Sequence, residues 1–128
     1  MGKYIVLHTI LFGFLVSGYL TGWIQAVVAS DHIYATPLIG GLTGLGSLLA
    51  GFNRWELTEW LADKLPSVGL VATVMGLLIS VQSAVAMGGL VENREQLAVD
   101  MIGSLVANMA GISGYLWLSL LKRVCHEE

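Results

Sequence analysis

Charged residues are scarce in this chain, and their scarcity defines the class of protein. Asp, Glu, Lys and Arg make up 12% of the 128 residues, whereas a typical soluble domain has about 25%. The net charge of -3 gives no basic surface, so electrostatic binding to nucleic acid is excluded. Apolar residues make up 55% of the chain, and the mean hydropathy is +0.76. This composition predicts an integral membrane protein.

The chain also lacks the groups of residues that catalysis and metal binding require. Its single cysteine, Cys125, excludes an internal disulfide framework. The three histidines, His8, His32 and His126, are far apart and give no metal-ligand spacing. No nucleophile–base–acid arrangement and no phosphate-binding loop is present. We therefore expect no enzymatic activity, no cofactor and no metal site.

Four apolar segments are long enough to cross a membrane as helices. They cover about residues 4–28, 33–52, 66–90 and 97–121. Each has 20 residues or more, and about 20 residues of helix cross the hydrocarbon core. The connections are short and leave no room for a soluble domain. We expect an all-α subunit in which residues 1–128 form one membrane domain of four helices.

The middle connection, residues 53–65, has the pattern of a short amphipathic helix. Asn53 can cap this helix, because Glu56 follows three residues later in the capping-box position. Apolar residues at helical spacing predict a stripe that lies on the membrane surface; they are Leu57, Trp60, Leu61 and Leu65.

The basic residues predict the orientation of the chain. Arg94 alone falls on one side of the expected spans, and five basic residues fall on the other: Lys3, Arg54, Lys64, Lys122 and Arg123. Cytoplasmic loops carry the excess of Lys and Arg. We therefore expect a multi-pass protein of a bacterial-type cytoplasmic (inner) membrane, with both termini in the cytoplasm.

Small residues recur along the third and fourth segments. The third begins at Pro66 and has a small residue at every fourth position, at Ala72, Gly76, Ser80, Ala84 and Gly88; the fourth has Gly103, Ala107 and Gly111. Small residues at this period let helices in lipid approach backbone to backbone. The two segments are joined by a short connection, so we expect them to be antiparallel neighbours.

Four polar residues lie among these small ones: Thr73, Ser104, Asn108 and Asp100. At 1.5 Å per residue, Thr73 and Asn108 are expected about 10 Å and about 20 Å above the cytoplasmic ends of their helices. Asp100 is expected close to the outer boundary. Two interpretations stay open at this point: these side chains line a polar path for ions, or they only hold the helices together.

The third segment, LPSVGLVATVMGLL, resembles the signature of the MotA/TolQ/ExbB proton channel family, which has a proline followed by G-L-x-G-T-V-x-G. The matching residues are Pro66, Gly69, Leu70, Thr73, Val74 and Gly76, and Ala72 stands where a glycine is usual. The fourth segment is similar to the family's A-L-x-A-T-x-x-G through Leu105, Ala107 and Gly111. It departs from the family at two positions: Asn108 replaces a threonine, and Gly103 stands where many members have a glutamate.

The resemblance implies a ring, by family a pentamer, whose third and fourth spans surround a central pore. A single-span partner of the ExbD/TolR/MotB kind would lie in the pore and supply the protonatable aspartate. This chain would supply Thr73 and Asn108 to the lining of a path for H⁺ or Na⁺. The family's large cytoplasmic region is absent from this sequence.

Three other functions are compatible with the sequence. A holin-like pore-forming protein would permeabilise membranes when expressed alone. A small transporter would be expected to carry an acidic residue in mid-span, and we place none there. A structural assembly protein would need only the packing of small residues.

Overall fold

The computed structural model describes residues 1–29 and 35–126, and every regular element in these ranges is an α-helix. The helices are α1 (Gly2–Thr21), α2 (Trp23–Ala29), α3 (Ala35–Gly51), α4 (Trp55–Ala86) and α5 (Arg94–Cys125). Three of them, α1, α4 and α5, are long and apolar enough to cross a membrane, whereas α3 has 17 residues. The expected all-helical fold of membrane character is confirmed.

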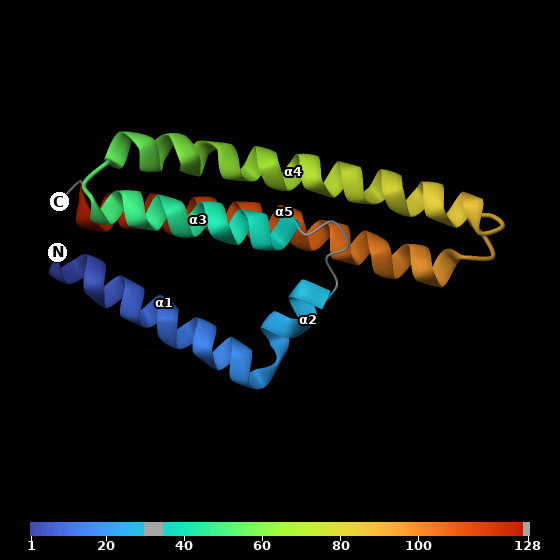
Figure 1. The fold of residues 1–128 in the computed structure, drawn as a ribbon, viewed down its shortest axis with the longest axis horizontal. Helices are drawn as coiled ribbons and strands as arrows, with labels where there is room; N and C mark the ends of the chain where they lie inside the picture. The colour runs from blue at the N-terminus through green and yellow to red at the C-terminus, as the bar shows by residue number, and fades with distance from the viewer. Residues whose placement is uncertain (30–34, 127–128) are drawn as a thin grey trace.

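Helices α4 and α5 form a long antiparallel hairpin along the length of the molecule (Figure 1). Backbone approaches backbone at its centre: a Cβ added to Gly69 would lie 2.8 Å from the Ala107 carbonyl oxygen and 3.3 Å from the Gly111 Cα. The small residues of α4 lie on its buried face, namely Gly69, Ala72, Gly76, Ser80 and Ala84. Those of α5 do the same, namely Gly103, Ala107, Gly111 and Gly114. The hairpin is therefore held by close packing of small side chains.

The expected surface helix over residues 53–65 is not a separate element. Helix α4 begins at Trp55 and continues through Pro66, which lies inside the helix and not at its start. A proline in a helix interior costs about 3 kcal/mol because it removes a backbone hydrogen bond. Contacts before the proline offset this cost. The buried Thr58 hydroxyl donates to the Gly46 carbonyl at 3.2 Å, and the Glu59 carboxylate pairs with Lys122 at 2.7 Å.

Asn53 caps a different helix from the one expected. Its φ of 61° is left-handed, and its N–H donates to the Ala50 carbonyl while the Arg54 N–H donates to the Leu49 carbonyl. This is the arrangement that ends an α-helix at a left-handed residue, so Asn53 terminates α3. The residue before α4 is Arg54, which makes no side-chain capping bond.

The first expected span, 4–28, is broken in two. Helix α1 ends at Thr21, because Gly22 takes a left-handed conformation with φ 84°. Helix α2 then runs in a different direction (Figure 1). The Trp23 side chain at the start of α2 packs back against Gly18 of α1.

Helix α1 is attached to the hairpin near one end and is otherwise exposed. The Tyr4 hydroxyl donates to the Ser47 carbonyl of α3 at 2.7 Å. The His8 ring meets the edge of Trp117 of α5 at a centroid distance of 5.5 Å. Beyond this contact α1 diverges from the other helices (Figure 1). Both chain termini lie at the end of the molecule where α1 is attached.

Candidate polar path along the helical hairpin

Thr73 lies inside the hairpin and joins its two helices. Its side chain is buried, with 6% of its surface exposed. Its Oγ1 atom lies 2.9 Å from the Gly69 carbonyl of α4 and 2.9 Å from the Ser104 carbonyl of α5. A hydroxyl has one hydrogen, so it donates to one of these carbonyls at a time. Within one subunit Thr73 therefore holds the helices in register.

This register changes the expected depth of Asn108. The Asn108 Cα would lie 3.2 Å from a Cβ added to Gly69, one turn before Thr73 on α4. Asn108 is thus nearer than Thr73 to the end that carries the termini, and the two are about one turn apart. The expected order and separation were wrong because they assumed that the helices begin and end level with each other. In the structure Lys122 of α5 pairs with Glu59, well before residue 66.

The side-chain amide of Asn108 has no partner within the described part of the subunit. Asn108 is half-buried, and no hydrogen bond joins its amide to another described residue. The other polar side chains of the hairpin centre, Thr73 and Ser104, both bond to backbone carbonyls. An amide in hydrocarbon is costly unless it is hydrogen-bonded. In a bilayer, water or a polar group outside the described part of the subunit would have to satisfy the Asn108 amide.

Asp100 lies on α5 beyond Ser104. The Ser104 hydroxyl donates to the Asp100 carbonyl at 3.0 Å, which places Asp100 one turn beyond Ser104 on α5. Because Ser104 lies beside Thr73, Asp100 lies beside about residue 77 of α4, well before α4 ends at Ala86. Its carboxylate accepts a hydrogen bond from Gln96 Nε2 at 2.9 Å. Asp100 is thus one turn above Ser104, as expected, and its position relative to the outer membrane boundary stays a prediction.

The same register staggers the uncharged parts of the two helices. Residues 65–86 of α4 and 101–121 of α5 contain no charged side chain. In this register the uncharged parts of the two helices overlap between Lys64 of α4 and Asp100 of α5. The overlap is about 13 residues, or about 20 Å. A hydrocarbon core of about 30 Å therefore also includes a charged residue of one helix.

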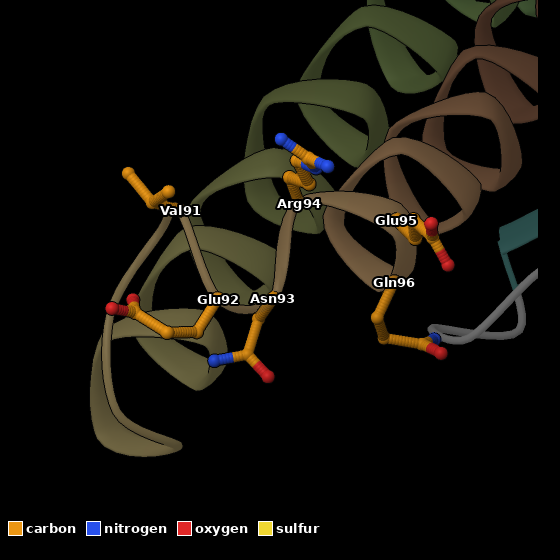
Figure 2. A pocket seen from close by; sticks show the side chains of 6 residues that line it. All are labelled: Val91, Glu92, Asn93, Arg94, Glu95 and Gln96. Carbon is orange, nitrogen blue, oxygen red and sulfur yellow. The ribbon is translucent and has the colours of Figure 1, made fainter.

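The turn that closes the hairpin is short and charged (Figure 2). Gly88 and Gly89 have φ of 121° and 129°, so the expected helical position of Gly88 was wrong, and it lies in the turn. Asn93 Nδ2 donates to the Ala84 carbonyl at 3.3 Å and to the Gly89 carbonyl at 2.9 Å. Figure 2 shows Arg94 on one side of this turn and Asn93 on the other.

Ser47 has a structural role that sequence reasoning missed. Its hydroxyl accepts a hydrogen bond from the Trp117 indole at 3.0 Å, and its carbonyl accepts one from Tyr4 at 2.7 Å. Ser47 thereby connects α1, α3 and α5. The sequence signal for this role was the position of Ser47 among glycines, because a glycine-rich helix face lets neighbouring helices pack closely. His32 lies outside the described residues, and within the described ranges no group of His, Cys, Asp or Glu could hold a metal ion.

Comparison with known proteins gives no family for this chain. No protein-family model, no curated protein and no solved structure matches it.

Proposed function

We propose that the protein is a ring-forming subunit of an ion-driven, most simply proton-driven, transmembrane motor or channel. In this proposal α4 and α5 face a central pore that holds a single-span partner of the ExbD/TolR/MotB kind. The subunit lies in a bacterial-type cytoplasmic membrane with both termini in the cytoplasm. The observation that carries the proposal is the unpartnered, half-buried amide of Asn108 in a membrane-length hairpin.

Lipid offers an amide no hydrogen bond, so Asn108 must meet water or a polar group of another chain. Both are provided by a pore at the centre of a ring. Asp100 lies about two turns beyond Asn108 on the same helix, so a carboxylate and an amide are about 12 Å apart along the hairpin. Polar and ionisable residues at such depth mark ion pathways in membrane proteins.

Thr73 and Ser104 have a positioning role in this proposal. The bond from the Thr73 hydroxyl to the Ser104 carbonyl supports the register of the two helices, and the Ser104 hydroxyl bonds to the Asp100 carbonyl within α5. The match of Thr73 to a conserved type of pore threonine in the MotA/TolQ/ExbB signature supports the assignment of α4 and α5 as the pore helices. The two departures from that signature, at Gly103 and Asn108, leave Asp100 as the carboxylate on the subunit nearest to the path.

Native mass spectrometry of the protein purified from its own membrane tests the proposal. We expect five copies of this chain together with a single-span protein. The variant Asn108→Leu should keep the five copies but lose ion uptake into membrane vesicles, whereas the neighbouring Met109→Leu should keep both. Met109 is 67% exposed and provides the control at the same depth.

Two outcomes would overturn the proposal. A monomer or dimer in native mass spectrometry would exclude a ring. Release of a small dye from liposomes that contain only this chain would show an open pore without a partner, as a holin-like protein forms.

A further inference from the structure

One face of α5 carries a line of polar residues of which only the first, Asn108, has a role in the function proposed above. These are Asn108, Tyr115, Ser119 and Lys122, here called the open stripe. Tyr115 follows Asn108 by seven residues and Ser119 follows it by eleven, so both lie within about 20° of it around the helix. Lys122 follows by fourteen and stays within about 40°. The open stripe thus runs for about 21 Å from Asn108 to the charged end of the hairpin.

Helix α3 packs on the opposite face of α5. Trp117 donates to Ser47 of α3, and a Cβ on Gly114 would meet Thr43 of α3. Trp117 follows Asn108 by nine residues, which is two and a half turns, so it points away from the open stripe. Within the described residues, the Asn108 amide and the Tyr115 and Ser119 hydroxyls have no hydrogen-bond partner.

The open stripe ends in a hollow between α4 and α5. Tyr115, Ser119, Lys122, Glu59 and Asp63 are among the residues that line it. The ion pair between Lys122 and Glu59 lies at this hollow, with the Glu59 side chain 53% exposed and the Lys122 side chain 24% exposed. Glu59 and Asp63 on the α4 side face Lys122 and Arg123 on the α5 side, so the charged groups that line the hollow balance.

We infer that the open stripe is a water-filled lane between this hollow and Asn108. Water is the occupant that satisfies three unpartnered polar side chains on one helix face, because lipid tails cannot donate or accept hydrogen bonds. The inference rests on the proposed function in that it names the cytoplasmic half of the same ion path, but it needs no partner protein.

Cysteine accessibility tests the lane in inside-out vesicles that contain the full chain with Cys125→Ser. Ser119→Cys is compared with Leu120→Cys, and Asn108→Cys with Met109→Cys. Each pair has nearly the same depth, and Leu120 and Met109, which are 43% and 67% exposed, lie about 100° around the helix from their partners. Impermeant thiosulfonate reagents modify thiols in water. We expect the two open-stripe cysteines to react at least tenfold faster than their neighbours.

Equal rates within each depth-matched pair would overturn the inference. Serine and asparagine differ little in size from cysteine, so loss of folding is not expected. Modification of the open stripe in a chain that forms no ring would refute the proposed function and leave the lane standing.

Discussion

The contact between Gly69 and Gly111 allows a sharp test of the hairpin. In Gly69→Ala the added Cβ would lie 2.8 Å from the Ala107 carbonyl oxygen and 3.2 Å from the Asn108 Cα. Both neighbours are backbone atoms, so no side-chain rotation relieves the overlap. The two helices must separate at the point where Thr73 reaches the Ser104 carbonyl.

The size of the effect follows from three contributions. Overpacking of a close contact costs about 1–3 kcal/mol. Weakening of the Thr73 hydrogen bond adds about 0.5–1.5 kcal/mol. Alanine in place of glycine recovers about 1 kcal/mol of helix propensity. We expect Gly69→Ala to lower the free energy of unfolding by about 1–3 kcal/mol.

The matched control is Gly44→Ala in α3. Nothing lies within 4 Å of a Cβ added to Gly44, so this variant gains helix propensity without a clash and should be as stable as the wild type or more so. Unfolding in mixed micelles with increasing SDS, followed by tryptophan fluorescence, measures both variants. If Gly69→Ala were as stable as Gly44→Ala, the close approach of the two helices would be wrong.

Three further predictions concern other polar positions. Thr73→Val should lower the free energy of unfolding by about 1 kcal/mol in the same assay, while Thr73→Ser should not, because the serine hydroxyl can make the same bond; equal losses would exclude a role for the hydrogen bond. Asn53→Ala should cost about 1 kcal/mol and Asn53→Gly almost nothing, since φ of 61° strains alanine but not glycine; the reverse order would contradict the cap on α3. Asp100→Asn should abolish ion uptake into vesicles without change in SDS resistance, and uptake at the wild-type rate would remove Asp100 from the path.

The small residues of the hairpin were accessible to sequence reasoning because their effect is local. Spacings of three and four residues place Gly69, Ala72 and Gly76 on one face of any helix, whatever lies opposite. The structure shows that the face is buried against α5. Composition and hydropathy predicted the all-helical fold, because these signals are also local and do not depend on contacts between distant residues.

The register of the hairpin was not accessible, because contacts far apart in the chain determine it. Thr58 bonds to Gly46 and Glu59 pairs with Lys122. These contacts stabilise the part of α4 that precedes Pro66, so the helix begins at Trp55. A proline at the start of an apolar run favours a helix start, and only the tertiary contacts override that preference. The position of Asn108 relative to Thr73 depends on this register, so the expected order and separation of these two residues were wrong.

Two helix ends show the same limit of sequence reasoning on a smaller scale. Asn53 and Gly22 both adopt left-handed conformations that end a helix. Asparagine is favoured both as a residue that begins a helix and as one that ends it, so its type alone could not decide between them. Gly22 sits in an apolar run whose hydropathy does not change, and hydropathy carries no signal for a turn there.

The stagger between α4 and α5 has a consequence for the bilayer around the protein. The shared uncharged length of about 20 Å is about 10 Å less than the thickness of a typical hydrocarbon core. A bilayer that keeps both charged residues out of its core thins next to an isolated hairpin, at a fraction of a kcal/mol for each ångström. Subunits that gather share the thinned zone and reduce the area of deformed membrane. We therefore expect the bilayer itself to favour association of this chain, more strongly in thick membranes than in thin ones.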